Sequence, residues 1–395
     1  MKTVIMAGGF GTRLRPLTCN LPKPMISIAN KPMMEHILTL LKKHNLVDVL
    51  TLLYFQGEEI KNYFGDGSKF GVNIQYFTAT EDYGTAGSVK NAEKLLFETE
   101  ERERFLIISG DVLTDINLSN AIDFHLKSKS MATMILSRKE NPLSYGVVIT
   151  EEDGKISRFM EKPTWGEVFS DTVNTGIYIL EPEVLEKIPP LQEYDFSKEL
   201  FPLILAERGK LYGYITTDYW RDVGNLSEYS QAQQDILEGK VKIEIEGNLL
   251  KRKEALIWVG KNVQVGKDVE FKGNIILGND SNIGSNSKIS NSIIGEGVQC
   301  GEGITMNRSV VWKDSFIGSK AILSETIVSF KTIVGEGSNL LENSVISENC
   351  IIGSRAKVYA NVKVWPGKEV ESDAILASSL VWGEKWNREL FTDAK

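Results

Sequence analysis

At 395 residues, with 42% hydrophobic and 25% charged residues, the chain is long enough for two domains with cores of their own. A formal net charge of -8 and the absence of a basic tract exclude nonspecific binding to nucleic acid, which depends on neutralising many phosphates. No apolar stretch is long enough to span a membrane, and neither a secretory signal nor a disulfide framework is indicated, so the cytoplasm is the expected compartment.

A short apolar run near the N-terminus, Val4 to Ala7, predicts a buried strand that ends in a glycine-rich turn, Gly8 to Gly11. Glycine can adopt positive φ and lets main-chain N–H groups approach a phosphate closely. The turn lacks the third glycine of a dinucleotide-binding loop and does not match a P-loop. Fixed positive charges follow instead at Arg13, Arg15 and Lys23, and they suit a triphosphate. The alternative for such a turn is an ordinary solvated loop.

Beyond the turn, strand-like and helical runs alternate along the chain. Asn30 and Pro32 predict the start of one helix, as its N-cap and first turn. The alternation predicts a mostly parallel sheet covered by helices, in which ligands bind at the carboxyl ends of strands. The other predicted elements are strands at 48–53, 72–77, 105–109 and 131–137, and helices at 85–97, 119–130 and 226–237.

Asp111 follows the predicted strand 105–109 almost directly. An acidic residue at such a place either caps the next turn or binds a metal ion. Magnesium ions prefer hard oxygen ligands, usually one or two protein carboxylates together with substrate phosphates. A second carboxylate is therefore needed, and Asp222 is the candidate. We predict a Mg²⁺ site formed by Asp111 and Asp222.

An aliphatic or similar residue recurs at every sixth position from Val259 to Leu376, with three one-residue slips. Such hexads, with Gly, Asn and Ser between the apolar positions, are typical of a parallel β-helix of about 18 residues per coil. Stacked coils bury an aliphatic column that no single coil could bury. The column comprises Val259, Val265, Phe271, Leu277, Ile283, Ile289, Ile294, Cys300, Met306, Val311, Ile317, Leu323, Val328, Val334, Leu340, Ile346, Ile352, Val358, Val364, Val370 and Leu376.

Parallel β-helices also occur in acyltransferases, where a histidine commonly acts as the base. The three histidines of this chain, His36, His44 and His125, all precede the repeats. We therefore expect the repeats to have a structural or oligomerising role, and the protein to be a homo-oligomer.

Two strings together, G-G-F-G-T-R-L-R-P-L-T at 8–18 and P-K-P-M at 22–25, resemble the signature of the sugar-1-phosphate nucleotidyltransferases. The resemblance covers essentially the whole chain, because several members carry a left-handed β-helix after the catalytic domain. It implies a Rossmann-like α/β catalytic domain at 1–240, a linker at 241–257, a left-handed parallel β-helix at 258–383 and a tail at 384–395. Some bacterial relatives continue into a phosphomannomutase-like domain at this point.

The resemblance also implies roles for individual residues. Arg13 and Lys23 match catalytic residues of the family, and Asp111 and Asp222 match its metal-binding aspartates. The positions that match its nucleotide contacts are Ala7, Gly8, Gly9, Gly11, Thr12, Glu81, Gly84, Thr85 and Ala86. Those that match its sugar-phosphate contacts are Gly146, Glu161, Lys162, Asn174 and Thr175.

Within the family, the motif is most similar to members that join mannose 1-phosphate and GTP, with Mg²⁺, to give GDP-mannose and pyrophosphate. Those members typically carry Pro-Leu where this chain has Asp82 and Tyr83, in the loop that reads the base. One alternative is the same chemistry with another pair of substrates, such as thymidylyl, uridylyl or adenylyl transfer to glucose 1-phosphate. Another is a regulatory homologue that binds nucleotide sugars without catalysis. GTP and a sugar 1-phosphate are the expected partners, with no nucleic acid and no membrane.

Overall fold

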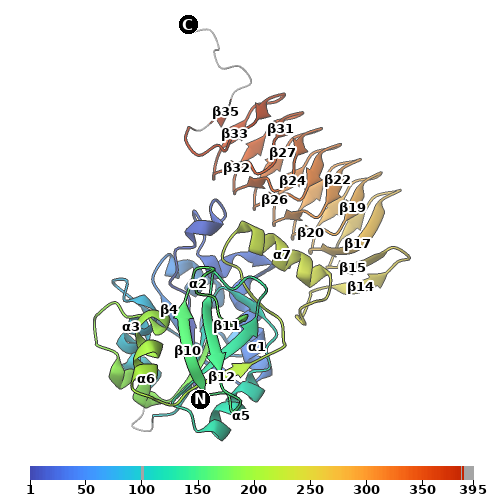
Figure 1. Ribbon diagram of the computed structural model, residues 1–395. Helices are drawn as coiled ribbons and strands as arrows, with labels where there is room; N and C mark the ends of the chain where they lie inside the picture. The colour runs from blue at the N-terminus through green and yellow to red at the C-terminus, as the bar shows by residue number, and fades with distance from the viewer. Residues whose placement is uncertain (99–101, 384, 387–395) are drawn as a thin grey trace. The chain divides into compact units, whose positions relative to one another are not determined.

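The computed structural model describes residues 1–98, 102–383 and 385–386, which form two compact units (Figure 1). The first unit contains Met1–Phe10, Pro22–Met25 and Met33–Val223. The second contains Gly11–Leu21, Ile26–Pro32 and the described residues from Gly224 on. The division is therefore not a single cut in the chain, because two short N-terminal segments pack with the C-terminal part.

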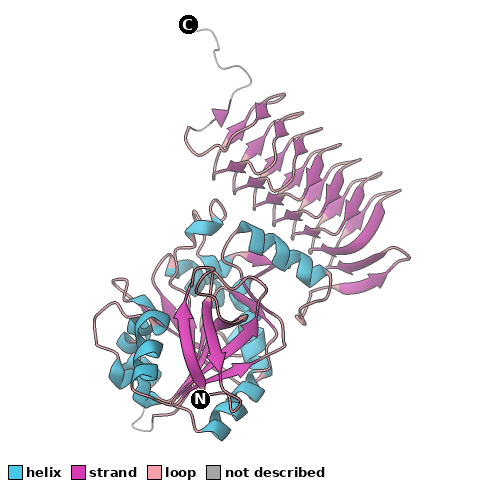
Figure 2. Cartoon of the chain, in the orientation of Figure 1, coloured by secondary structure: helices cyan, strands magenta, loops and turns pink. Residues whose placement is uncertain are grey.

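A nine-stranded sheet forms the centre of the first unit (Figure 2). Its strands are β1 (Thr3–Met6), β4 (Asp48–Leu53), β5 (Asn73–Thr78), β6 (Phe105–Ser109), β8 (Ala132–Arg138), β9 (Gly146–Thr150), β10 (Ile156–Glu161), β11 (Thr172–Leu180) and β12 (Leu211–Ile215). The order is β10-β9-β11-β6-β1-β4-β5, and β8 connects β11 to β12. The expected parallel sheet is present in β6, β1, β4 and β5, whereas β11 runs antiparallel to β6, β8 and β9.

Helices cover both faces of this sheet. Neighbouring residues of β1 belong to different cores, since Val4 packs with one cluster and Ile5 with the other. A strand buried on both faces reads as a continuous apolar run, as the sequence predicted. The helices of this unit are α1 (Met33–Lys43), α2 (Gly57–Phe64), α3 (Gly84–Asn91), α4 (Glu93–Leu96), α5 (Leu118–Ser128) and α6 (Phe201–Ala206), with shorter turns η2 (Lys23–Met25), η3 (Ser68–Phe70), η4 (Pro182–Lys187) and η5 (Phe196–Leu200).

The second unit is built on a left-handed parallel β-helix. One face is formed by β15 (Ala255–Val259), the end of β17 (Glu270–Leu277), β20 (Ile293–Ile294), β23 (Val310–Val311), β26 (Ile327–Val328), β29 (Val345–Ile346) and β32 (Lys363–Val364). The second face is formed by β16 (Gln264–Val265), β18 (Asn282–Ile283), β21 (Gln299–Cys300), β24 (Phe316–Ile317), β27 (Ile333–Val334), β30 (Ile351–Ile352), β33 (Glu369–Val370) and β35 (Lys385–Trp386). The third is formed by the start of β17, β19 (Lys288–Ser290), β22 (Thr305–Asn307), β25 (Ile322–Ser324), β28 (Asn339–Leu340), β31 (Lys357–Val358) and β34 (Ile375–Leu376).

The hexad column predicted from the sequence forms the core of this β-helix. From Leu277 to Leu376 every predicted member is buried in one cluster, while Val259 and Phe271 are partly buried against it. Val265 differs, because it is 43% exposed. It lies in the first coil, which has no earlier coil to cover it. Ahead of that coil, β14 (Asn248–Lys251), which lies within the segment predicted as a linker, pairs antiparallel with β15.

Three consecutive coils are one residue shorter than the others. The partners of Ile276 follow one another at Ile293, Val310 and Ile327, each seventeen residues on, whereas Val345 comes eighteen residues after Ile327. The missing residue lies each time at the corner between the third and first faces. We call these corners, residues 290–293, 307–310 and 324–327, the short corners. They account for the slips in the hexad pattern.

Helix α7 (Leu226–Leu237) packs beside the short corners within the second unit. Gln234 Nε2 donates to the Asn291 carbonyl at 3.2 Å, and a cavity of about 130 Å³ lies between α7 and the side chains of Arg308 and Glu325. Tyr229 OH accepts a hydrogen bond from Trp312 Nε1 at 2.8 Å. The helix is thus tied to the β-helix by polar contacts along its length.

One predicted helix start is wrong, and one predicted helix is interrupted. Asn30 does not cap a helix, because Lys31–Pro32 (β3) pairs with Ser27–Ile28 (β2) in a hairpin, and α1 begins only at Met33. Ala29 and Asn30 both have positive φ, the conformation of a two-residue hairpin turn, which asparagine adopts readily. The helix predicted at 85–97 is interrupted at Ala92, between α3 and α4.

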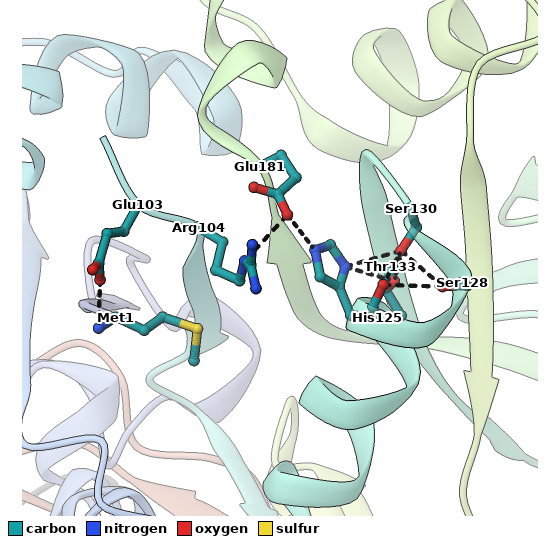
Figure 3. A network of polar contacts seen from close by, with 8 residues as sticks. All are labelled: Met1, Glu103, Arg104, His125, Ser128, Ser130, Thr133 and Glu181. Atoms are coloured by element: carbon teal, nitrogen blue, oxygen red, sulfur yellow. Dashed lines mark hydrogen bonds and ion pairs between the residues drawn. The ribbon is translucent and has the colours of Figure 1, made fainter. Parts of the chain in front are cut away.

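A polar network surrounds His125 at the edge of the sheet where β6 and β8 begin (Figure 3). His125 Nε2 lies 3.2 Å from Glu181 Oε1, and its Nδ1 lies 2.8 Å from Thr133 Oγ1 and 3.0 Å from Ser130 Oγ. Arg104 also contacts Glu181, at 3.1 Å. The network joins α5, β8 and β11 at the edge opposite the carboxyl end of β6. No helix in the described part of the chain has the length and apolar character needed to cross a membrane.

Candidate active site

A cavity of about 380 Å³ lies in the first unit where β1, β4 and β6 end. This is the position at which open α/β sheets bind ligands. The turn after β1 forms one wall, and a Cβ on Gly8 would lie only 3.1 Å from Tyr54 Cβ, so glycine fits the close packing there. The predicted nucleotide contacts that line the cavity are Ala7, Gly8, Gly9, Glu81, Gly84 and Thr85, together with Asp111.

The loop that opens α3 is held by a second segment, around Tyr194. The N–H groups of Ala86 and Gly87 both donate to the Tyr194 carbonyl at 2.9 Å. Gly84 has a φ of 65°, and a Cβ on Gly87 would lie 2.4 Å from the Gln192 carbonyl oxygen, so neither position accepts a larger residue without rearrangement. Ala86 is itself buried and its N–H is already bonded. It therefore supports the cavity wall from behind.

Two acidic residues in the cavity, Glu193 and Asp195, were not anticipated from the sequence. Asp195 accepts a hydrogen bond from Thr85 Oγ1 at 3.0 Å and caps η5 by accepting from Ser197 N at 2.8 Å. Thr85 in turn accepts from Phe196 N at 2.9 Å, so it joins two loops and is not the N-cap of α3. The only local signal for Asp195 was its suitability as a helix cap, because its contact with Thr85 spans 110 positions of sequence.

Asp111 and Asp222 converge on Lys23. The short ladder between β7 (Val112–Thr114) and β13 (Trp220–Asp222) places Asp222 opposite Val112, next to Asp111. Lys23 Nζ contacts the Asp111 carboxylate directly and lies 3.6 Å from Asp222 Oδ1. Ser109 also donates a hydrogen bond to Asp111. The structure thus brings together three residues that lie far apart in the sequence.

The charges at this site are set by burial and by the lysine. Burial alone would raise the pKa of the Asp111 carboxyl. The Lys23 ammonium and the hydrogen bonds from Lys23 and Ser109 outweigh that effect and hold this pKa below its usual value. Asp111 is therefore an anion at neutral pH. Two carboxylates around one cation form a donor set that also fits a divalent metal ion.

Protein groups alone would not complete such a metal site. Within the described ranges, which leave out 99–101, 384 and the residues after 386, no group of three or more His, Cys, Asp or Glu side chains could hold a metal ion. A magnesium ion typically takes one or two carboxylates and completes its six ligands with water and substrate phosphates. Asp111 and Asp222 match that pattern.

The first group of predicted sugar-phosphate contacts lies at the paired ends of β9 and β10. Gly146 is opposite Glu161 in this ladder, and a Cβ on Gly146 would lie 2.7 Å from Glu161 Oε2. Lys162 follows, with its N–H bonded to the Tyr145 carbonyl and its Nζ 3.8 Å from Glu161 Oε1. Burial raises the pKa of Glu161, and Lys162 opposes that shift. The structure therefore brings these three residues together.

The second group, Asn174 and Thr175, lies at an irregularity of β11. The ladder between β11 and β8 shifts register between Asn174 and Tyr178, and Gly176 has a φ of 75°. Asn174 Nδ2 donates to Tyr178 OH at 2.9 Å, and Thr175 Oγ1 donates to the Ile135 carbonyl at 2.7 Å. Such bulges often re-aim side chains beside active sites. Both of these side chains are bonded to the protein itself.

Gly11, Thr12 and Arg13 belong to the second unit. Gly11 has a φ of 61° and starts the turn η1 (Thr12–Leu14), in which Arg13 is exposed. From the sequence, the glycine turn was predicted to be a single element. In the structure its first part, up to Phe10, belongs to one unit and its second part to the other.

Two family models match different parts of this chain. A family model described as nucleotidyl transferase matches residues 2–239, and one described as the LbH domain of the EIF2B epsilon subunit matches residues 254–358. A UTP–glucose-1-phosphate uridylyltransferase from Synechocystis is 39% identical over 62% of this chain and 66% of its own. A mannose-1-phosphate guanylyltransferase from Mycobacterium tuberculosis and a mannose-1-phosphate guanyltransferase from Yarrowia lipolytica are 34% and 38% identical, over 60% and 58% of this chain. The matches span 62 to 66% of the length of these relatives.

Solved structures of other proteins have folds similar to that of this chain. A putative glucose-1-phosphate thymidylyltransferase from Bacillus anthracis superposes with a TM-score of 0.53 at 24% identity, covering 59% of this chain and 94% of its own. HddC from Yersinia pseudotuberculosis has a TM-score of 0.52, covering 60% of this chain and 99% of its own.

Proposed function

This chain belongs to the nucleotidyl transferase family, and on that basis we propose that it joins mannose 1-phosphate and GTP to give GDP-mannose and pyrophosphate. The observation that carries the proposal is the convergence of Asp111 and Asp222 on Lys23, beside the glycine turn at the carboxyl ends of the strands. A protein that only bound nucleotide sugars would have no physical need for this full charged set. The guanylyl and mannose assignments draw on the names of several relatives.

The reaction is an in-line displacement at the α-phosphorus of the nucleotide. An oxygen of the sugar phosphate forms a bond to that phosphorus while the bond to the β-phosphate oxygen breaks, and pyrophosphate leaves. Such a transfer needs positioning and charge neutralisation more than covalent help from the protein. In the proposal, Arg13 stabilises the charge that develops on the departing pyrophosphate, and Lys23 contacts the reacting phosphates.

Asp111 and Asp222 are proposed to hold a magnesium ion. When bound, Mg²⁺ would neutralise phosphate charge and align the two substrates. The carboxylates that now surround the Lys23 ammonium supply oxygens of the required kind. Ser109 orients one of them through its hydrogen bond to Asp111.

The acidic residues that line the cavity favour guanine as the base of the nucleotide. Guanine presents two adjacent N–H donors on one edge, and a single carboxylate can accept both. Glu81, Asp82 and Glu193 all line the cavity and provide such carboxylates. Ala7, Gly8, Gly9, Gly84 and Thr85 complete the proposed nucleotide site, with Ala86 behind them. Gly11 and Thr12 are proposed to contribute from the second part of the turn.

The proposed sugar-phosphate site comprises Gly146, Glu161 and Lys162, backed by Asn174 and Thr175. Glu161 offers an acceptor for sugar hydroxyl groups, and Lys162 offers a cation for the phosphate. A Cβ at residue 146 would lie 2.7 Å both from Glu161 Oε2 and from the Phe159 ring, so a side chain there requires these neighbours to shift.

A second candidate is the same chemistry with other substrates, and the 39% identity to a uridylyltransferase favours uridylyl transfer to glucose 1-phosphate. A panel of four nucleoside triphosphates against mannose 1-phosphate and glucose 1-phosphate, read by pyrophosphate release, separates the two. We expect the largest kcat/KM with GTP and mannose 1-phosphate. Preference for UTP and glucose 1-phosphate would establish the second candidate, and no turnover with any pair would overturn transfer altogether.

A further inference from the structure

The segment Gly11–Leu21, which carries Arg13, packs against the β-helix within the second unit. Ser347 Oγ donates a hydrogen bond to the Pro16 carbonyl at 3.0 Å, and Ser347 is only 1% exposed. One residue on, Glu348 Oε1 accepts from Asn20 Nδ2 at 2.7 Å. These two contacts join positions that are more than 320 residues apart in the sequence.

Ser347 occupies a position at which earlier coils have glycine. The residues that follow the strands of the first face are glycines in the early coils, Gly278 and Gly295, and a Cβ on either would lie 2.5 to 2.6 Å from backbone of the next coil. In later coils the same position is Trp312 and then, two coils on, Ser347. Trp312 bonds α7 through Tyr229, and Ser347 bonds the segment Gly11–Leu21. Two of the departures from glycine in this column, Trp312 and Ser347, thus coincide with contacts to other parts of the unit, and Ser329 and Trp365 occupy the same position in other coils.

The segment itself is a compact, internally bonded turn. Leu14 N donates to the Gly11 carbonyl at 3.0 Å, and Thr18 Oγ1 donates to the same carbonyl at 2.7 Å. Cys19 N donates to the Pro16 carbonyl, which Ser347 also contacts. Ser347 and Glu348 thus fix the C-terminal half of a turn whose N-terminal half presents an exposed arginine.

We propose that Ser347 and Glu348 are positioning residues for Arg13, an inference that rests on the proposed transferase function. They do not contact the substrates. They hold the turn that carries Arg13 in one conformation, so that its charge is already in place when the pyrophosphate leaves. Preorganised charge stabilises a transition state because little reorganisation is needed during the reaction. The β-helix therefore contributes to turnover and is more than a scaffold.

The test uses the full chain with Ser347→Ala, Glu348→Ala and two matched controls. Ser338→Ala removes a buried β-helix hydroxyl that bonds the Gly335 and Gly353 carbonyls within the β-helix, and Glu336→Ala removes a surface carboxylate near Lys320. Amide hydrogen exchange of residues 11–21 reports the order of the turn without requiring activity. We expect about tenfold faster exchange there in the two test variants and no change in the controls, as for loss of about 1.4 kcal/mol of local stability.

Kinetics supply the second readout. We expect kcat to fall about tenfold in Ser347→Ala and Glu348→Ala with KM nearly unchanged. In an Arg13→Ala background the same substitutions should lower kcat no further, because their effect acts through Arg13. Unchanged exchange at 11–21, or kcat losses that add to that of Arg13→Ala, would overturn the inference. If the wild-type chain transfers no nucleotide, the proposed function fails, and the exchange data alone then decide whether the β-helix orders this turn. Glu348 lies nearer the surface, so its variant remains informative if Ser347→Ala folds poorly.

Discussion

Arg13 is the side chain on whose charge turnover should depend most directly. It is exposed in η1, where an arginine is not needed to fill a core. Replacing it with alanine removes a fixed positive charge from the proposed leaving-group side of the reaction. We expect Arg13→Ala to lower kcat by about a hundredfold or more, as loss of one preorganised donor does elsewhere. Arg138→Ala, which removes an exposed arginine paired with Asp171, is the control. Near-normal turnover of Arg13→Ala would exclude the role.

The two aspartates give a separate prediction about the metal ion. Asp111→Asn and Asp222→Asn keep the size of each side chain but remove the charge that a divalent cation requires. Each should abolish most activity and raise the Mg²⁺ concentration needed for what remains, while the melting temperature stays within a few degrees. Asp123→Asn, on the exposed side of α5, is the matched control. Full activity of either variant at limiting Mg²⁺ would show that the residue is not a ligand.

His125 should make stability depend on pH. Burial lowers the pKa of its imidazole below the ordinary value of 6.5, and this outweighs the opposite effect of Glu181. The unfolded chain therefore binds more protons than the folded chain just below pH 6.5. The contribution to stability is complete above pH 6.5 and is lost as the pH falls toward the folded-state pKa.

Thermal unfolding between pH 7.5 and 5 tests this. We expect a flatter pH profile for His125→Gln than for the wild type. Ser128→Ala should keep the wild-type profile, because Ser128 bonds Ser130 but not the ring (Figure 3). If the melting temperature depends on pH equally in the wild type and in His125→Gln, a group other than His125 causes the loss of stability at acid pH.

Some residues of the site can be predicted from a local sequence pattern, whereas others are placed there only by contacts between distant parts of the chain. The glycine turn and the strand before Asp111 were recognisable because both depend on a few adjacent residues. Asp222 was found by asking for a second carboxylate. Asp195 and Ser347 were not found, since their roles depend on contacts that span 110 and 331 positions and each is an ordinary residue in its local sequence.

At the scale of elements, α7 depends on a buried tyrosine. Tyr229 OH donates to the Ser27 carbonyl at 2.9 Å and accepts from Trp312 Nε1 and from Gln233 Nε2, both at 2.8 Å. Tyr229→Phe would leave buried donors and an acceptor without this partner. We expect a loss of about 1–3 kcal/mol in the free energy of unfolding, measured by denaturant titration. Tyr359→Phe, in a tyrosine that is 39% exposed, should change it little. Equal stability of the two variants would contradict the role of Tyr229.

Elements with strong periodicity were predicted well. The strand at 48–53 and the helix at 226–237 have the predicted bounds, and the hexads located the β-helix. The strands from β9 to β12 were not singled out. The side chains of β9 and β10 neither alternate regularly between buried and exposed nor form a continuous buried run, whereas β12 does alternate and carried a local signal that was missed. Asn30 was misassigned for a physical reason: the same residue type suits a helix cap and a hairpin turn with positive φ.

At the scale of the whole molecule, the β-helix should be needed for stability as well as for assembly. A variant ending at Lys240 would keep Gly11–Leu21, Ile26–Pro32 and α7 but lose the core with which they pack. We expect a lower melting temperature than for the full chain and, if the β-helix sets the oligomeric state, fewer subunits by light scattering. An unchanged subunit number in the variant ending at Lys240 would place assembly within residues 1–240.

At the short corners, the number of residues between apolar positions matters for the structure as much as the identity of those residues. Each lacks one residue at the same corner of consecutive coils, beside α7. Because a shift of one position turns an inward side chain outward, moving the gap from the corner at 324–327 to a place between residues 310 and 316 would exchange Ile317 of the buried column with its exposed neighbour Phe316. Alignments of such chains should therefore anchor their gaps at this corner. A template with a uniform six-residue repeat would assign buried positions to exposed residues in the middle of the β-helix.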